Sequence, residues 1–545
     1  MTLVLGIGGG GTPSRDAAAC LVDDAGRVLA LVAEERVAGA RCGSWPRRAV
    51  ERCLELADTR WPEVTVVAVG RRLPHDSPVR RPVDLLERIG APSRELGRLK
   101  VEFVGSHEAL IAAAVGCCGA PQAAVLVADA AGEDGPVSLW RWQEGQAQRL
   151  EVWPQTCSPG QLMDETARWM GPGITPGAVA DLAAYGAHMV PPDPGWLRVG
   201  DDGMRSLLGA DARINHAVAA DLWQARIAEF AGSGPRPDRP ARQLPMDRIA
   251  CRVAAAAQTT VARVMQQLAA RARRLAGTDV LCVAGSMARN EHVMGRLERP
   301  LFTAPVPDGA RGAALGAAWT LSPPSPAQLM DPYRGSYAGL PPAPATGRTR
   351  EATDPARVAE LLASGQLVGV AWGRSEAGTR QLGHRTVLAT PTDRTILGTL
   401  ARVSGALPWR PAAVIARHRA HLLWAETGAL EPYGAGRAPL TEQGQTQLPA
   451  AAHRDGTVLP HLLVETGSPV AAILDALEAG GQPPVLLTAP LAAPTGPLAE
   501  TTDQAVRGAG RHGLDLLVTG AAGEALIRFD RSLPWRAAPA PGARR

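Results

Sequence analysis

The sequence predicts an α/β protein of two domains, and three observations support this. The chain has 545 residues and 46% hydrophobic content, enough for more than one hydrophobic core. Short apolar runs alternate with longer segments of helical periodicity throughout, a pattern typical of α/β domains. A proline-rich segment over residues 322–355 separates the two halves. We therefore expect domains at residues 1–345 and 346–545.

The first domain opens with three predicted strands and a helix. Apolar runs over Leu3–Ile7, Ala17–Val22 and Val28–Ala33 are joined by short polar or glycine-rich turns, which predicts strands. Pro46–Ala57 is amphipathic and begins with proline, which suits the first helical turn. Three strands followed by a helix form the opening unit of an actin-like ATPase lobe. Residues 8–11 are four glycines, which either cradle a phosphate through their amides or form a plain turn.

Two further strands and two long helices are expected in the rest of this domain. Ala124–Ala128 is an apolar run that ends at Asp129, and Val280–Val283 runs into Ala-Gly-Ser. Segments 207–230 and 246–276 have helical periodicity and are separated by a Pro/Gly/Arg loop. In the second domain we expect a helix at 356–363 and strands at 367–371, 485–487 and 514–518.

Composition argues against several classes of partner. The chain has 57 basic and 53 acidic residues, a formal charge of +4, so no nucleic-acid surface is expected. No apolar stretch is long enough to predict a membrane span. The eight cysteines include no CxxC pair, and the N-terminal segment lacks a basic region before its apolar run. We expect a reduced, cytoplasmic protein.

Several separated segments resemble the carbamoyltransferase family, which includes nodulation proteins and enzymes that carbamoylate cephalosporin- and aminoglycoside-type antibiotics. Residues 177–186, Gly-Ala-Val-Ala-Asp-Leu-Ala-Ala-Tyr-Gly, are similar to the family's Gly-Lys-Val-Met-Gly-Leu-Ala-Pro-Tyr-Gly. Residues 284–290, Ala-Gly-Ser-Met-Ala-Arg-Asn, resemble its Ala-Gly-Gly-Val-Ala-Leu-Asn. The densest match is residues 373–385, Gly-Arg-Ser-Glu-Ala-Gly-Thr-Arg-Gln-Leu-Gly-His-Arg, against Gly-Arg-x-Glu-x-Gly-Pro-Arg-Ala-Leu-Gly-x-Arg. Residues 409–411, Trp-Arg-Pro, look like its Phe-Arg-Pro element.

This resemblance implies an actin-like ATPase domain (ASKHA superfamily, Kae-type) followed by a YrdC-like α/β domain. In the family, the C-terminal domain uses ATP and carbamoyl phosphate to form carbamoyl adenylate. The N-terminal domain then passes the carbamoyl group to a small-molecule hydroxyl, with a metal ion holding the adenylate. The implied ligands are therefore ATP, a divalent metal (iron or magnesium), carbamoyl phosphate and a small-molecule acceptor.

The resemblance also implies site residues. Asp129 matches one expected metal ligand, and Asp308 is a candidate second ligand if its loop is rebuilt, because it lies two residues from the position of the family's other aspartate. Histidines of the family site are replaced here by Ser106 and Leu110, and an aspartate by Ala310. We expect two catalytic groups. His107 is either a remnant metal ligand or general base, or a structural histidine. Asp16 is either a carboxylate of the site or the cap of a turn. Nucleotide-binding residues are expected at Gly285, Ser286, Asn290 and Gly312.

The substrate-binding residues expected in the second domain are Arg374, Arg380, Arg385 and Arg410, because a guanidinium group can bind phosphate through two parallel hydrogen bonds. His453, just before an Asp-Gly-Thr turn, is a further candidate that matches no assigned family role and is otherwise structural. Glu376 either serves this site or pairs with a neighbouring arginine to hold its loop. The family's Lys-x-Arg-Glu element corresponds to the uncharged residues 404–407, and its asparagine-containing loop to residues 488–497. Losing several charge-assisted contacts, each worth about 1.5–3 kcal/mol, predicts weaker phosphate binding.

The sequence leaves three functions open. The first is a degenerate carbamoyltransferase-family protein of antibiotic or other natural-product biosynthesis, a pseudoenzyme acting as the partner of an intact family paralogue. The second is an active ATP-dependent O-carbamoyltransferase with rearranged ligands. The third is altered acyl transfer by one domain only. Because replacements are scattered over both sites, we favour the first.

Overall fold

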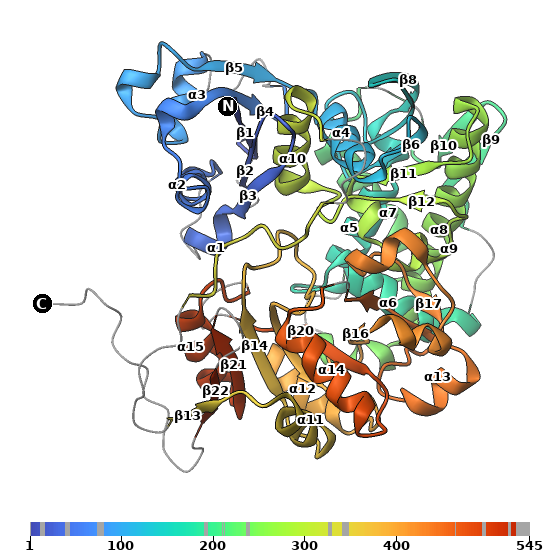
Figure 1. Ribbon diagram of the computed structural model, residues 1–545. Coiled ribbons are helices and arrows are strands. Elements are labelled where there is room, and N and C mark those ends of the chain that lie inside the picture. Colours follow the sequence, from blue (N-terminus) through green and yellow to red (C-terminus); the bar gives the residue numbers. More distant parts are fainter. Residues whose placement is uncertain are drawn as a thin grey trace, which may run out of the picture.

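The computed structural model describes residues 2–10, 17–38, 44–72, 81–189, 194–209, 211, 213–235, 240–324, 330–339, 348–463, 465–492, 498–520 and 525–529. Their strands form two five-stranded sheets, one eight-stranded sheet and two short strand pairs. In Figure 1 the two five-stranded sheets lie in the upper half and the eight-stranded sheet lies below them.

Lobe 1 is built on the first sheet, in the order β3-β2-β1-β4-β5. β1 (Leu3–Gly8) pairs antiparallel with β2 (Ala18–Val22) and parallel with β4 (Val64–Val69). β3 (Val28–Ala33) and β5 (Lys100–Phe103) form the edges. The apolar runs become strands because both faces of β1 and β2 are buried.

Lobe 2 repeats this topology. Its sheet runs β8-β7-β6-β11-β12, again with three antiparallel strands followed by two parallel ones. The strands are β6 (Gln122–Ala128), β7 (Val137–Gln143), β8 (Gln146–Trp153), β11 (Leu281–Ala284) and β12 (Leu301–Phe302). This duplicated order is that of an actin-like ATPase, so the fold class predicted for the first domain is confirmed.

Two helices join the lobes. α4 (Ser106–Cys118) follows the last strand of lobe 1 but packs on β6 and β11 of lobe 2, while α10 (Gly309–Leu321) follows lobe 2 and packs on β1, β2 and β4. The approach is so close that a Cβ at Gly8 would lie 1.9 Å from the Ala310 carbonyl oxygen. Glycine at β1 is therefore required by helix packing.

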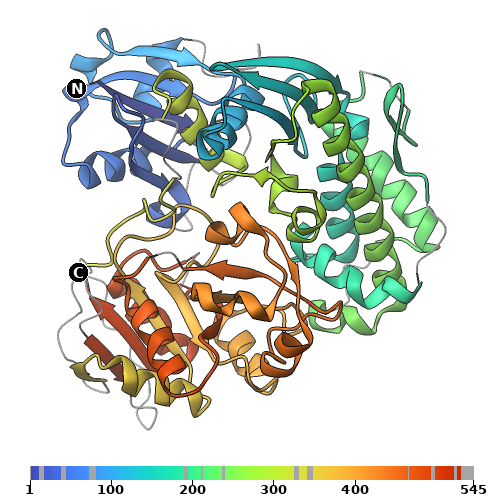
Figure 2. The same ribbon diagram turned by 45° about the vertical axis from the view of Figure 1, so that its right-hand side comes forward.

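The other helices of lobe 2 form a large side layer around its main core (Figure 2). They are α5 (Pro159–Met170), α6 (Pro176–Gly186), α7 (His216–Ala231), α8 (Arg248–Ala276) and α9 (Glu291–Arg296). Their starts are set by capping side chains: Asn215 accepts from the Val218 N–H, and Asp247 from those of Ile249 and Ala250. The expected helix at 207–230 therefore begins at 216. The hairpin of β9 (Leu197–Gly200) and β10 (Gly203–Ser206) precedes it.

The C-terminal domain is a mixed sheet with helices on both faces, in agreement with the α/β domain expected there. Its order is β13-β22-β21-β14-β15-β20-β16-β19. The strands are β13 (Arg348–Ala352), β14 (Val368–Trp372), β15 (Arg385–Ala389), β16 (Ala413–Ala416), β19 (Pro460–Leu462), β20 (Val485–Pro490), β21 (Leu516–Gly520) and β22 (Ala525–Phe529).

Separate apolar cores cover the two faces of this sheet. α11 (Pro355–Ala363) and α14 (Pro469–Ala479) share one core, and α12 (Ile396–Ser404) and α15 (Thr502–His512) share the other. β13 falls inside the proline-rich segment that we expected to be a linker. It belongs to the eight-stranded sheet because it pairs with β22. The boundary expected at 345 and 346 lies in residues 340–347, outside the described residues.

Two further expectations concern the whole chain. No helix among the described segments is long and apolar enough to cross a membrane. The cysteines at 20, 53, 117, 118, 157, 251 and 282 are unpaired thiols.

Candidate functional site

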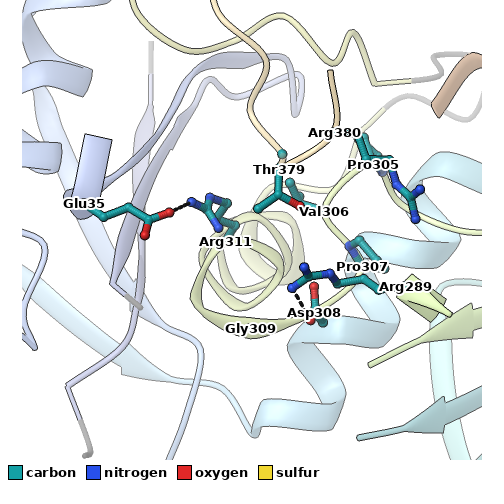
Figure 3. Close-up of a pocket in the computed structure, with 11 residues that line it drawn as sticks. Glu35, Arg289, Pro305, Val306, Pro307, Asp308, Gly309, Arg311, Thr379 and Arg380 are labelled. Atoms are coloured by element: carbon teal, nitrogen blue, oxygen red, sulfur yellow. Dashed lines mark hydrogen bonds and ion pairs between the residues drawn. The ribbon is translucent and has the colours of Figure 1, made fainter. Parts of the chain in front are cut away.

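A pocket of about 420 Å³ lies where the two lobes meet the C-terminal domain, a volume within the ordinary range of small-molecule sites. Figure 3 shows the side chains around it. Three parts of the chain line it: Glu35 from lobe 1, Arg289 with residues 305–309 and Arg311 from lobe 2 and α10, and residues 378–380 from the C-terminal domain.

The start of α10 forms one wall. Asp308 is its N-cap residue, and its side chain does not cap the helix. Instead its Oδ2 accepts from Arg289 Nη1 at 3.4 Å. Arg311, in the first turn, donates to Glu35 of α1 (Glu34–Ala38) in lobe 1. Free N–H groups give a helix N-terminus partial positive charge, which adds to the two guanidinium groups.

Arg380 forms the opposite wall. Its Nη1 donates to Glu291 Oε1 at 2.9 Å and also to the carbonyl oxygen of Gly434. Burial is the main cause that lowers the pKa of Arg380, with Glu291 acting against it. Each of the three guanidinium groups that line the pocket, at Arg289, Arg311 and Arg380, is paired with one carboxylate. A guanidinium group carries five N–H donors, more than one such pair uses, so the three groups together suit an anionic ligand.

Asp129 lies at the carboxyl end of β6, beside the carboxyl end of β11. Burial raises its pKa to about 6, the charge of Asp308 adds to this, and the backbone and hydroxyl of Ser286 act against it. Asp164 of α5 also has a pKa raised to about 6, mainly by burial and then by Asp129. The structure thus brings the two expected metal ligands, Asp129 and Asp308, into electrostatic contact.

These carboxylates do not form a complete cation site. Among the described residues, no three His, Cys, Asp or Glu side chains converge as metal ligands. Asp308 is already paired with Arg289, and Asp16 lies outside the described residues. The described residues therefore do not by themselves make up the site expected for a divalent metal, which takes its ligands from several converging side chains.

His107 lies in a separate crevice, on the first turn of α4. Its Nδ1 is 2.7 Å from Ser138 Oγ, and its buried Nε2 has no hydrogen-bond partner. Burial lowers its pKa to about 4, so the ring is neutral at pH 7. Arg72, Glu108, Glu133, Asp134 and Arg149 surround it. These neighbours do not line the larger pocket, so the structure does not bring His107 to that site.

The four expected nucleotide residues pack against protein. A Cβ at Gly285 would lie 2.3 Å from the Ala128 carbonyl oxygen, and one at Gly312 would lie 2.7 Å from that of Val306. Asn290 caps α9 and exchanges two hydrogen bonds with Gln258 of α8. Ser286 faces Asp129. These contacts close the β11 end of lobe 2 around Asp129.

Arg374 and Arg385 donate to the protein's own backbone. Arg374 donates to the carbonyl oxygens of Leu29, Arg334 and Gly335. Arg385 is completely buried, and it donates to five backbone carbonyls, those of Ser336, Trp372, Gly373, His384 and Glu500. Burial lowers its pKa to about 10. In this structure both guanidinium groups hold the C-terminal domain against residues 334–336.

Glu376 has a related role. Its Oε1 accepts from the N–H groups of Leu382, His384 and Arg385. The alternative in which this side chain holds its loop therefore fits the geometry, although its partners are amides and not arginine side chains. The loop in turn places Arg380 beside the pocket.

Arg410 and His453 lie in a polar cluster between lobe 2 and the C-terminal domain. Arg410 Nε donates to Asp181 Oδ2 at 2.7 Å, and His453 Nδ1 is 3.1 Å from Asp455 Oδ1. His292 lies between the two carboxylates, 3.1 Å from Asp181 and 3.5 Å from Asp455. Neither Arg410 nor His453 lines the pocket.

Sequence reasoning missed Arg289, Arg311 and Arg437. Arg289 stands inside the segment 284–290 where the similar motif has leucine. That departure was a readable signal, but its partner Asp308 is set only by the fold.

Comparison with known proteins gives the family. A family model described as "Carbamoyltransferase C-terminus" matches residues 359–524. The nodulation protein NolNO of Sinorhizobium fredii is 27% identical over 484 residues, covering 81% of this chain and 68% of that protein. An uncharacterized protein of Synechocystis sp. is 27% identical over 463 residues, covering 73% and 72%. NolO of Bradyrhizobium diazoefficiens is 32% identical over 158 residues, covering 26% and 29%.

Solved structures align more weakly. Component A of the (R)-2-hydroxyglutaryl-CoA dehydratase of Acidaminococcus fermentans has a TM-score of 0.30 and 17% identity, covering 58% of this chain and 96% of that one. Full-length HypF in its phosphate- and nucleotide-bound form has a TM-score of 0.32 and 12% identity, covering 59% and 55%. With its C-terminal domain match and its nodulation-protein relatives, the chain is a divergent member of the carbamoyltransferase family.

Proposed function

We propose that this chain binds a small phosphate-bearing anion in the pocket between the lobes and the C-terminal domain, and that it does not complete the ATP-dependent carbamoyl phosphate reaction. The supporting observation is the convergence of Arg289, Arg311 and Arg380 on one pocket beside the N-terminus of α10. Three guanidinium groups beside a helix N-terminus suit phosphate oxygens. Carbamoyl phosphate and the phosphates of ATP are the ligand classes we expect.

Two observations support the loss of the complete reaction. The guanidinium groups of Arg374 and Arg385 donate hydrogen bonds to backbone carbonyl oxygens. These side chains would have to break those bonds before either could bind a phosphate. The described carboxylates and histidines do not assemble three metal ligands. On this proposal the protein acts in small-molecule biosynthesis as the binding partner of an intact family paralogue.

The proposal has two parts, an anion-binding pocket and the absence of the complete reaction. Ligand binding tests the first part and turnover tests the second. Calorimetry of the full chain with carbamoyl phosphate, ATP and pyrophosphate tests the pocket, and we expect at least one to bind. Arg380→Ala should weaken that binding, whereas Arg213→Ala, which removes an exposed arginine, should not. Absence of binding by all three ligands would overturn the anion site.

The second candidate is an active O-carbamoyltransferase, and Asp129 favours it. A carboxylate whose pKa is about 6 is suited to accept a proton from an acceptor hydroxyl near neutral pH. Pyrophosphate release from ATP that depends on added carbamoyl phosphate would establish this candidate and refute the partner role. No release, together with co-purification of an intact paralogue, would support the partner role.

A further inference from the structure

Asp181 is a fully buried carboxylate that receives hydrogen bonds from three cationic or ionisable side chains. It lies on α6 of lobe 2, and only 2% of the residue is exposed. Arg410 Nε donates to Oδ2 at 2.7 Å and Arg437 Nη2 to Oδ1 at 3.1 Å, while His292 Nε2 is 3.1 Å from Oδ1. Both arginines belong to the C-terminal domain, so a single carboxylate joins that domain to lobe 2.

This arrangement is that of a bound oxyanion. Burial acts to raise the pKa of Asp181, but Arg410, Arg437 and His292 outweigh it and hold that pKa well below its usual range. Guanidinium and imidazole groups converging on two oxygens are also how proteins bind free carboxylates and phosphates. The difference here is that a covalent link to α6 supplies the anion.

The surroundings retain unused polar atoms. Arg437 Nε and His453 Nε2 are buried and have no hydrogen-bond partner. The rings of His292 and His453 have centroids 5.6 Å apart, and Asp455 contacts both. Without the carboxylate of Asp181, Arg410 Nε, Arg437 Nη2 and His292 Nε2 would lose the acceptor that they share. The side chain of Arg437 is buried, so its positive charge would be left without this partner.

We infer that Asp181 is a built-in anion, filling a latent oxyanion site formed by Arg410, Arg437 and His292, and that deleting its carboxylate opens this site to small oxyanions. Formate is the expected best ligand because it matches the deleted group, with acetate and inorganic phosphate progressively larger. In the structure, the Nε–H of Arg410 is already used by Asp181. This latent site is distinct from the pocket lined by Arg380.

Chemical rescue tests this inference. Asp181→Ala removes the carboxylate and leaves space, whereas Asp181→Asn removes the charge but keeps the volume. Thermal unfolding of the full chain should show a lower Tm for both variants. Sodium formate should raise the Tm of Asp181→Ala saturably, by roughly 5 °C at a concentration about a hundredfold above its Kd. Sodium chloride at the same concentration should not raise the Tm. Formate should not raise the Tm of wild type or of Asp181→Asn.

Two further measurements keep the test decisive. Arg410→Met in the Asp181→Ala background should abolish the formate response, because one of the donors is gone. Asp181→Ser leaves a smaller space and serves if Asp181→Ala folds poorly, and either variant should be recovered in formate. A formate response no greater than that to chloride, or one that survives Arg410→Met, would overturn the inference. So would failure of both variants to fold even in formate.

Discussion

Arg380 of the C-terminal domain donates to Glu291 of lobe 2, with 2.9 Å between Nη1 and Oε1. Glu291 begins α9, and its own carbonyl oxygen accepts from the N–H of Arg437. The contact therefore fixes the wall of the pocket that Arg380 forms against lobe 2. A binding site assembled in this way depends on the docking of two domains.

The first prediction concerns Arg380 itself. Arg380→Ala should weaken binding of the ligand found by calorimetry by about 10- to 100-fold, because one charge-assisted contact is worth about 1.5–3 kcal/mol. Arg213→Ala makes the same change in net charge at a side chain that is 90% exposed and should leave Kd unchanged. Equal Kd values for the two variants would remove Arg380 from the site.

The second prediction concerns pH and Asp129. The folded pKa of about 6 lies above the unfolded value of about 3.9, so the native state binds the extra proton and stability falls as pH rises from 4 to 6. Asp129→Asn should therefore stabilise the chain at pH 7 by about 3 kcal/mol and do little at pH 4. Urea unfolding at both pH values measures this. A variant less stable than wild type at pH 7 would contradict the argument.

The third prediction has the opposite sign and concerns His107. Its folded pKa of about 4 lies below the unfolded value of about 6.5, so the unfolded state binds more protons between these limits. The contribution of His107 to the stability of the folded state is complete above pH 6.5 and is lost as the pH falls toward 4. Between pH 7 and 4.5, the free energy of unfolding of His107→Asn should fall by about 2–3 kcal/mol less than that of wild type. The exposed His188→Asn serves as the control, and identical pH profiles of the two variants would contradict this.

The fourth prediction concerns Arg385. Arg385→Met removes a buried guanidinium group that donates to five backbone carbonyl oxygens. Three of these oxygens also accept from backbone N–H groups, but losing a buried hydrogen-bond network is strongly destabilising. We expect a loss of about 3–5 kcal/mol in urea unfolding. Arg357→Met on α11, where the side chain is 55% exposed, should stay within about 0.5 kcal/mol of wild type. A small effect of Arg385→Met would mean that those carbonyls find other partners.

Local sequence patterns predicted the α/β class and several of its strands and helices. Alternation and apolar runs depend on neighbours two to four residues apart, so the strands around Leu3–Ile7 and Ala124–Ala128 were readable. Helix starts depend on capping, which is why the helix expected from 207 begins at His216 after Asn215. The dense segment 373–385 was also readable, and its family is confirmed by the C-terminal match.

Only the tertiary structure decided what the charged side chains do. Arg36 and Glu500 pair across 464 residues of sequence, and Arg410 meets Asp181 across 229. Local patterns carry no information on such pairs, because they arise from the packing of two lobes against a third sheet. Five arginines that look alike in sequence consequently differ: Arg380 lines the pocket, Arg374 and Arg385 donate to backbone carbonyls, and Arg410 and Arg437 hold Asp181. Burial and desolvation set these roles, and both are properties of the folded chain.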